Sequence, residues 1–229
     1  MTQKHTDKAF DDELSKLREK ILLMGAKVET MLSTGVRAFH EQDTALAHRT
    51  IEMDHDVNRL EVEIDSFCLS ILARRQPVAS DLRFLTTALK LVTDLERIGD
   101  LAVNIGERVL ELSSDPPRRS WPDLLAMAEI VQNMVRDALD AFVAGDAAKA
   151  NWVIERDRSV DALYAQVFHE MLLVMIEDRT AVPRGVSVQA IAKYLERIGD
   201  HATNLAEMVV FLTQGTDIRH PESVENEEN

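Results

Sequence analysis

The sequence predicts an all-α protein built as a tandem repeat of two antiparallel three-helix bundles. Apolar residues recur at alternating three- and four-residue steps over long segments, which is the pattern of amphipathic helices. Glycine and proline are scarce, at 8 and 6 in 229 residues, and they lie mostly where these segments end. The second half of the chain also repeats motifs of the first half, so the helices should form two related bundles.

The first bundle is expected over residues 8–112. Its first helix carries a single apolar stripe made of Leu14, Leu17, Ile21, Met24, Val28 and Met31. Asp43 is a suitable N-cap for the second helix, and Pro77 breaks that helix. The three helices should run over about residues 8–40, 44–75 and 80–112.

The second bundle is expected over residues 123–214, after a segment, 113–122, that holds three prolines and no helical periodicity. Its first stripe consists of Leu124, Ala128, Val131, Val135, Ala138 and Phe142. Asp146 should cap the next helix. The three helices should begin near Leu124, Ala147 and Ser187 and end near Phe142, Asp178 and Gln214. The acidic tail, 215–229, is expected to be disordered.

An internal duplication relates the two halves. Many residues recur at a constant offset of 103, as from Ala38 to Ala141 and from Leu60 to Leu163. The string LERIGD at residues 95–100 returns unchanged at 195–200, an offset of 100, so the second half has lost three residues between these points, near Pro183. Repetition at a fixed period indicates a repeated structural unit.

Charge and composition restrict the possible functions. The formal net charge of −14 makes an extended contact with nucleic acid or an anionic lipid surface repulsive. No apolar signal core and no stretch able to span a bilayer is recognised, so the protein is expected in the cytoplasm without membrane insertion. The single cysteine, Cys68, is expected to be a buried, inert thiol. No nucleotide-binding or acyl-transfer motif is present, so we expect no enzyme.

The repeated LERIGD segments place oxygen ligands on one face of a helix. Their members at i, i+4 and i+8 are Glu96, Asp100 and Asn104, and Glu196, Asp200 and Asn204. A facing column, Asp157 and Asp161, would complete a cage for iron, manganese, magnesium or zinc. The first half has Asp54 and a neutral Asn58 at the matching place, so the second half is expected to bind metal more tightly.

The alternative to a metal site is a surface ladder of ion pairs, which has the same spacing and contributes only tenths of a kcal/mol. Against that alternative, each LERIGD segment keeps a glycine inside a helix, Gly99 or Gly199, at a cost of roughly 1 kcal/mol relative to alanine. We expect a neighbouring backbone to approach closely there, bringing the flanking carboxylates toward a partner helix.

The string RRQPVASDLR at residues 74–83, followed by DLERIGD at 94–100 and the second ERIGD at 196–200, resembles the PhoU family of phosphate-transport accessory proteins. The resemblance extends from about Phe10 to His220. It implies two symmetric three-helix bundles, metal clusters on E(D)xxxD motifs in some members, and homodimers. It also implies two partners, the ATPase of the phosphate ABC transporter and the sensor histidine kinase that controls phosphate-starvation genes. Such an adaptor would regulate phosphate uptake and keep the kinase inactive when phosphate is plentiful.

By position, the metal motif of the family corresponds to Glu96 with Asp100, Glu196 with Asp200, and Asp157 with Asp161. Asp54 with Asn58 departs from it. These correspondences are implied by the resemblance, and they select the same residues as the helical spacing does.

Two rival functions remain open. A ferritin-like carboxylate protein needs Glu-x-x-His on two helices, but only Glu52 with His55 fits, because the repeat has Glu155 with Arg158. A purely structural helical scaffold would keep every helix and lose the metal. Histidines such as His40, His48 and His201 are expected to be solvated. The adjacent arginines at 74–75 and 118–119 do not resemble a phosphate cage, so phosphate status should arrive through a partner.

Overall fold

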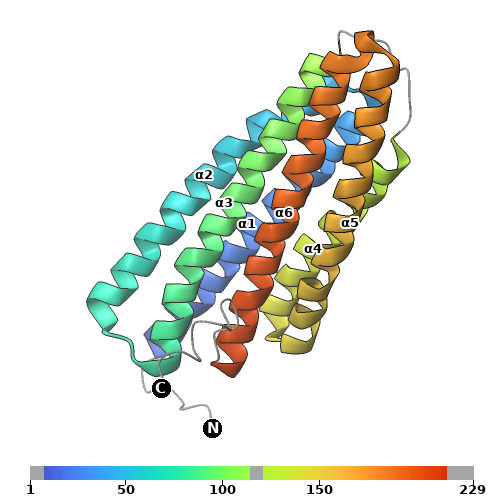
Figure 1. The fold of residues 1–229 in the computed structure, drawn as a ribbon. Coiled ribbons are helices and arrows are strands. Elements are labelled where there is room, and N and C mark those ends of the chain that lie inside the picture. Colours follow the sequence, from blue (N-terminus) through green and yellow to red (C-terminus); the bar gives the residue numbers. More distant parts are fainter. Residues whose placement is uncertain (1–7, 114–120, 216–229) are drawn as a thin grey trace, which may run out of the picture.

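The structure is a computed structural model that describes residues 8–113 and 121–215. Within these ranges the chain forms six long α-helices, one 3₁₀ turn and no strand (Figure 1). The elements are α1 (Lys8–Glu41), α2 (Thr44–Arg75), α3 (Ala79–Leu112), α4 (Pro122–Ala144), α5 (Ala147–Glu177), η1 (Arg179–Ala181) and α6 (Val182–Gln214). The predicted all-α fold class is therefore confirmed.

The helices form two antiparallel groups of three that lie side by side (Figure 1). Helices α1, α2 and α3 pack on one another, as do α4, α5 and α6. The two groups meet along α3 and α6, with a smaller contact between α1 and α4. Buried apolar side chains from all six helices form one continuous core. The two halves are thus joined along their central helices rather than linked as separate bodies.

Capping residues explain where the helices begin and end. Asp43 Oδ1 accepts hydrogen bonds from the backbone N–H groups of Ala45 and Leu46, at 2.8 and 3.1 Å. Asp146 caps α5 in the same way. Gly145, with φ of 63°, ends α4 in the left-handed region that glycine enters without strain. Both predicted aspartate caps are confirmed.

Helix α6 begins five residues earlier than predicted. We expected a start near Ser187 because Pro183 was taken as a break, but Pro183 lies in the first turn of α6. Proline is tolerated there, since the first N–H groups of a helix have no partner within the helix. Asp178 accepts a hydrogen bond from Thr180 N–H at 2.8 Å and caps the preceding turn η1. Most of the segment 113–122 and of the tail 215–229 lies outside the described residues.

Helix α5 contradicts the expectation that no segment could span a bilayer. By length and composition it passes that test, with a mean hydropathy of 1.3 over an 18-residue window. In the structure α5 packs against α4 and α6 and buries Val153, Val160, Val167 and Met171. Only 17% of the apolar window is buried, however, so much of its apolar surface faces outward.

Candidate functional site

Each LERIGD segment faces an aspartate of the neighbouring helix in the same half. The first segment lies on α3 opposite α2, and the second lies on α6 opposite α5. Leu95, Ile98 and their counterparts Leu195 and Ile198 are buried in the core, which orients the intervening carboxylates toward α2 or α5. The duplication therefore produces two acidic clusters, one in each half.

The second acidic cluster consists of Asp157 and Asp161 on α5 with Glu196 and Asp200 on α6. Burial, and then the carboxylates of Asp200, Asp161 and Glu196 in that order of effect, raise the pKa of Asp157 to about 6. Burial also raises the pKa of Asp200, with Glu196 as the next cause. The ammonium group of Lys193 lies 2.6 Å from Glu196 Oε2 and offsets part of the negative charge.

The first acidic cluster contains Asp54 on α2 with Glu96 and Asp100 on α3. Burial and then the charge of Asp100 raise the pKa of Glu96 to about 7, and the same two causes raise the pKa of Asp54. The side-chain amide of Asn58 donates a hydrogen bond to Asp54 Oδ2 at 2.7 Å. Asp54 Oδ1 is buried and has no hydrogen-bond partner. A buried, unsatisfied carboxylate oxygen is a position that a cation would stabilise.

Glu61 on α2 belongs to the first cluster, and the sequence reasoning missed it. Burial raises its pKa, and the carboxylates of Asp65 and Asp100 raise it further. Glu61 lies seven residues after Asp54, two helical turns along the same face, so helical spacing could have revealed it. The matching residue in the second half is Tyr164, which accepts a hydrogen bond from Gln189 Nε2 at 3.2 Å.

Glu61 removes the reason for expecting tighter metal binding in the second half. That expectation counted three carboxylates against four, with Asn58 as the neutral substitute. With Glu61 included, each cluster holds four carboxylates. The number of anionic ligands therefore no longer distinguishes the two halves.

The side chains of the two clusters do not converge on a single point. Among residues 8–113 and 121–215, no group of three or more His, Cys, Asp or Glu side chains is arranged to hold a metal ion as it stands. Neighbouring cations occupy some of the oxygens instead. Arg97 Nη1 lies 3.2 Å from Asp100 Oδ2, and Lys193 contacts Glu196. The donor set suits a hard cation, but binding one requires these flexible side chains to turn.

The glycines of LERIGD approach side chains, not backbone, so the expected backbone contact is wrong. A Cβ on Gly199 would lie 3.4 Å from Val160 Cγ1 and 3.5 Å from Asp157 Oδ1, and Gly99 has similar neighbours on α2. These are ordinary van der Waals distances. The close backbone approach occurs at Gly106, where a Cβ would lie 3.1 Å from the carbonyl oxygen of Ala47.

Asn204 does not complete the column with Glu196 and Asp200. Its side-chain amide donates a hydrogen bond to Asp94 Oδ1 on α3 at 3.2 Å. His201 Nδ1 lies 2.7 Å from the same oxygen. The prediction that His201 is solvated is therefore wrong, whereas His40 and His48 are exposed as expected. Asp94, His201 and Asn204 connect the two halves across α3 and α6.

The ferritin-like alternative fails on the positions of its ligands. Glu52 and His55 are both exposed on α2, so neither side chain enters a bundle interior where a di-iron site would lie. Cys68 is fully buried, and burial raises the pKa of its thiol to about 12, so it is the inert residue that the sequence predicted.

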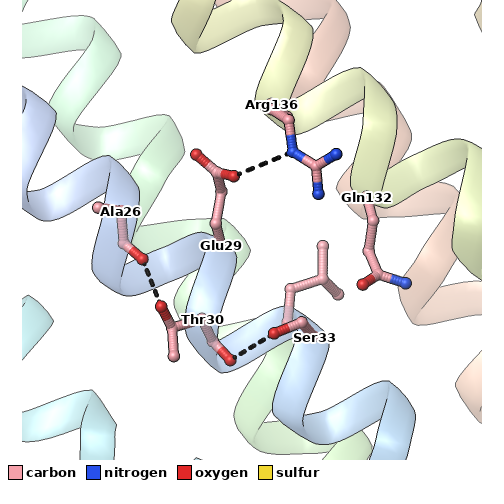
Figure 2. Close-up of a pocket in the computed structure, with 7 residues that line it drawn as sticks. Ala26, Glu29, Thr30, Ser33, Gln132 and Arg136 are labelled. Carbon is pink, nitrogen blue, oxygen red and sulfur yellow. Dashed lines mark hydrogen bonds and ion pairs between the residues drawn. The ribbon is translucent and has the colours of Figure 1, made fainter.

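A polar groove of about 240 Å³ lies between α1 and α4 (Figure 2). Glu29 of α1 and Arg136 of α4 face each other across it, with a carboxylate oxygen 3.6 Å from Nε. Burial raises the pKa of Glu29, and Arg136 opposes that effect. The hydroxyls of Thr30 and Ser33 donate to backbone carbonyls of α1, at 2.7 and 3.1 Å, so both hydrogens are already used. The ion pair of Glu29 with Arg136 across the groove connects the two halves.

Comparison with known proteins accounts for the duplication. The PhoU domain model matches the chain twice, over residues 21–109 and 124–209. The phosphate-specific transport system accessory protein PhoU homolog of Pseudomonas putida is 42% identical, covering 94% of this chain and 85% of that protein. The Escherichia coli (strain K12) accessory protein PhoU is 37% identical, covering 95% and 90%.

Solved structures show the same fold. The crystal structure of PhoU from Pseudomonas aeruginosa matches with a TM-score of 0.88 and 40% identity, covering 90% of this chain and 100% of that one. The phosphate transport system regulatory protein PhoU from Streptococcus pneumoniae matches with a TM-score of 0.85 and 30% identity, covering 91% and 99%. With both halves matched by the domain and relatives aligned over nearly its full length, this chain belongs to the PhoU family.

Proposed function

We propose that this chain is an accessory protein of the phosphate-specific transport system, acting as an adaptor that regulates phosphate uptake and restrains phosphate-starvation signalling. The observation that carries the proposal is the double match to the PhoU domain, together with full-length similarity to proteins named as accessory to that transport system. The long helices offer extended side surfaces, and the groove between α1 and α4 offers no nucleophile paired with a base. A regulatory role fits these features better than catalysis does.

The proposed partners are the ATPase of the phosphate ABC transporter and the sensor histidine kinase of the phosphate response. The names of the relatives support an association with the transporter. The kinase and a homodimeric state are further parts of the proposal. We place the protein in the cytoplasm, where both partners expose the domains that an adaptor would contact.

We also propose that the two acidic clusters bind metal ions, with iron, zinc, manganese and magnesium as the candidates. The ligands would be Asp54, Glu61, Glu96 and Asp100 in the first half, and Asp157, Asp161, Glu196 and Asp200 in the second. Support comes from the grouped carboxylates with raised pKa values and from the unsatisfied Asp54 Oδ1. A bound cation would neutralise carboxylates that otherwise repel one another.

The direct test of the adaptor role is binding. The purified full-length chain is immobilised, and the transporter ATPase subunit and the cytoplasmic part of the sensor kinase are passed over it separately. The proposal expects saturable binding of at least one of them. An unrelated ABC-transporter ATPase subunit is the control, and equal binding of that control, or binding of none of the three, would overturn the proposal.

A further inference from the structure

The polar groove between α1 and α4 lies where equivalent positions of the two halves face each other. At the offset of 103 residues, Glu29 of α1 corresponds to Gln132 of α4, and Ser33 corresponds to Arg136. All four residues line the groove. The repeats have therefore diverged at this point, so that one wall carries a carboxylate and the other a guanidinium (Figure 2). We call this feature the α1–α4 groove.

The two charges of the α1–α4 groove are only loosely paired. Glu29 Oε2 lies 3.6 Å from Arg136 Nε, and the two side chains are 31% and 59% exposed. For comparison, Lys27 Nζ of the same helix lies 2.7 Å from Asp56 Oδ2. An ion pair of this length and exposure contributes little to stability. A ligand that carries both charges could therefore separate Glu29 from Arg136 at a small energetic cost.

The uncharged polar groups of the α1–α4 groove offer oxygen lone pairs to a ligand. The hydroxyls of Thr30 and Ser33 donate their hydrogens to backbone carbonyls of α1. The side-chain amide of Gln132 donates to the carbonyl oxygen of Ala128 at 3.1 Å, and its oxygen is turned toward α1 (Figure 2). Within the described parts of the chain, none of these three side-chain oxygens accepts a hydrogen bond. An ammonium group, with three N–H donors and no acceptor, matches them.

The residues of the α1–α4 groove disfavour an inorganic anion and a divalent metal ion as occupants. Arg136 carries the only positive charge among the described residues that line the groove, and the carboxylate of Glu29 would repel phosphate. A site for Ca²⁺ or Mg²⁺ takes most of its six or more ligands from oxygens that include carboxylates, and Glu29 supplies the one carboxylate here. Leu32, which is buried, and Ala26 give the groove an apolar part that suits a short aliphatic group.

Beyond the α1–α4 groove, the charges along the two helices are mixed. Arg37 of α1 pairs with Glu41 at 3.4 Å, and Asp140 of α4 pairs with Lys149 at 2.8 Å, so these groups have partners outside the groove. Glu129 is exposed on α4 and adds one negative charge. Because both signs are present, the surroundings do not favour a strongly charged ligand of either sign. The groups inside the groove therefore decide what binds.

We propose that the α1–α4 groove binds a small zwitterionic α-amino acid with an aliphatic side chain. The ammonium group of the ligand would contact the Glu29 carboxylate and the three oxygens described above. Its carboxylate would pair with the guanidinium of Arg136, and its side chain would cover Leu32. The groove volume of about 240 Å³ is below the range of about 300–1,000 Å³ for drug-sized ligands, as a single amino acid requires. This inference goes beyond the adaptor role and does not depend on it.

The test is equilibrium dialysis of the full-length chain against radiolabelled L-valine, in the presence of unlabelled competitors. We expect saturable binding of one valine per chain. N-acetyl-L-valine lacks the ammonium charge and isobutylamine lacks the carboxylate, so each should compete about tenfold more weakly than valine, because each loses one charge-assisted contact. Inorganic phosphate at the same concentration should not compete. Competition by phosphate, or by either analogue as strongly as by valine, would overturn the proposal.

Two substitutions test whether the binding occurs in the α1–α4 groove. Glu29→Gln and Arg136→Gln should each weaken valine binding about tenfold or more, since each removes the charge that one end of the ligand contacts. The matched controls are Arg37→Gln and Glu41→Gln, which alter an exposed ion pair of α1 outside the groove and should leave binding unchanged. Thermal unfolding checks that all four variants fold.

The remaining outcomes are also decisive for the α1–α4 groove. If valine binds the wild type and all four variants alike, it binds elsewhere and the inference is wrong. The inference also fails if valine, alanine and leucine all show no saturable binding up to about 10 mM, which is weaker than the affinity expected of a specific site. Neither result bears on the adaptor role, which the binding of the transporter ATPase and the sensor kinase tests separately.

Discussion

Glu96 shows how the environment of one residue sets the chemistry of the first acidic cluster. Burial beside Asp100 raises the pKa of its side chain from an ordinary 4.5 to about 7. A carboxyl group whose pKa is raised on folding binds its proton more tightly in the folded state. The stabilisation is therefore fully present below the unfolded pKa, and it is lost as the pH rises from about 4.5 through about 7.

Replacing Glu96 by glutamine should therefore raise stability in a pH-dependent way. In metal-free protein, Glu96→Gln should raise the melting temperature at pH 8, where the native carboxylate is charged and repelled, and change it little at pH 5. Thermal unfolding followed by circular dichroism at both pH values measures this. Glu52→Gln, at an exposed position of α2, is the control. An equal effect of Glu96→Gln at both pH values would contradict the explanation.

Metal binding should depend on single carboxylates in both clusters. Asp200→Asn, Asp100→Asn and Glu61→Gln should each lower the bound metal per chain, because each removes one anionic ligand. Chelation should lower the melting temperature of the parent, since a ligand at about 100 times its Kd stabilises the folded state by about 2.7 kcal/mol.

Elemental analysis and thermal unfolding with added iron, manganese or zinc are the measurements for these variants. Asp12→Asn, at an exposed position near the start of α1, is the control. If the variants bind as much metal as the parent, or if the parent binds none, the metal-binding hypothesis fails. The carboxylates would then form only ion-pair ladders.

Among single residues, the sequence predicted the carboxylates that recur in both halves, and it missed Glu61, which does not recur. Repetition directed attention to Glu96, Asp100 and their counterparts, all of which lie in the clusters. Glu61 has Tyr164 as its counterpart, so repetition could not identify it. Likewise, no local pattern indicated that Asn204 turns toward Asp94, because that contact joins residues 110 positions apart.

The helices that carry the clusters begin at aspartate caps, and these caps should contribute separately to stability. Asp43→Ala and Asp146→Ala each remove two hydrogen bonds from backbone N–H groups to Oδ1. Each substitution should lower the free energy of unfolding by about 1 kcal/mol. Urea denaturation measures it, with Asp12→Ala as a control within α1. A negligible change at both caps would show that the helix starts are fixed by tertiary packing instead.

Helix boundaries followed from the sequence wherever one signal decided them. The ends of α2 and the start of α5 agree with prediction because Asp43, Pro77 and Asp146 act locally. The start of α6 was misplaced because Pro183 is compatible both with a break and with a first helical turn. The exposed face of α5 is a third case, since its apolar residues satisfy a helical pattern that does not reveal which of them are buried.

Because α3 packs along α6, we expect the two halves to unfold together as a single cooperative unit. Ile64 of the first half is fully buried, and both tryptophans, Trp121 and Trp152, lie in the second half. Ile64→Ala should lower the free energy of unfolding by about 2–5 kcal/mol. If the halves unfold together, tryptophan fluorescence and circular dichroism should shift to the same lower melting temperature. An unchanged fluorescence transition would show that the second half unfolds independently.

The duplication predicted two bundles, but not how they are joined. Asp94 pairs with His201, while Tyr194 and Leu101 occupy the duplicated positions, so this contact between the halves has no symmetric copy. The ion pair of Glu29 with Arg136 also joins residues that no sequence repeat relates. Such contacts depend on how the two halves pack against each other. The residue pattern of a single helix carries no information about that packing.

In its proposed role, the molecule restrains the phosphate-starvation response as an accessory of phosphate transport. To test this role, the gene is deleted and a phosphate-starvation reporter is measured in phosphate-rich medium, with the intact chain restored from a plasmid. We predict that the reporter rises on deletion and returns to its repressed level when the chain is restored. A reporter that stays repressed in the deletion strain would contradict a restraining role for this protein.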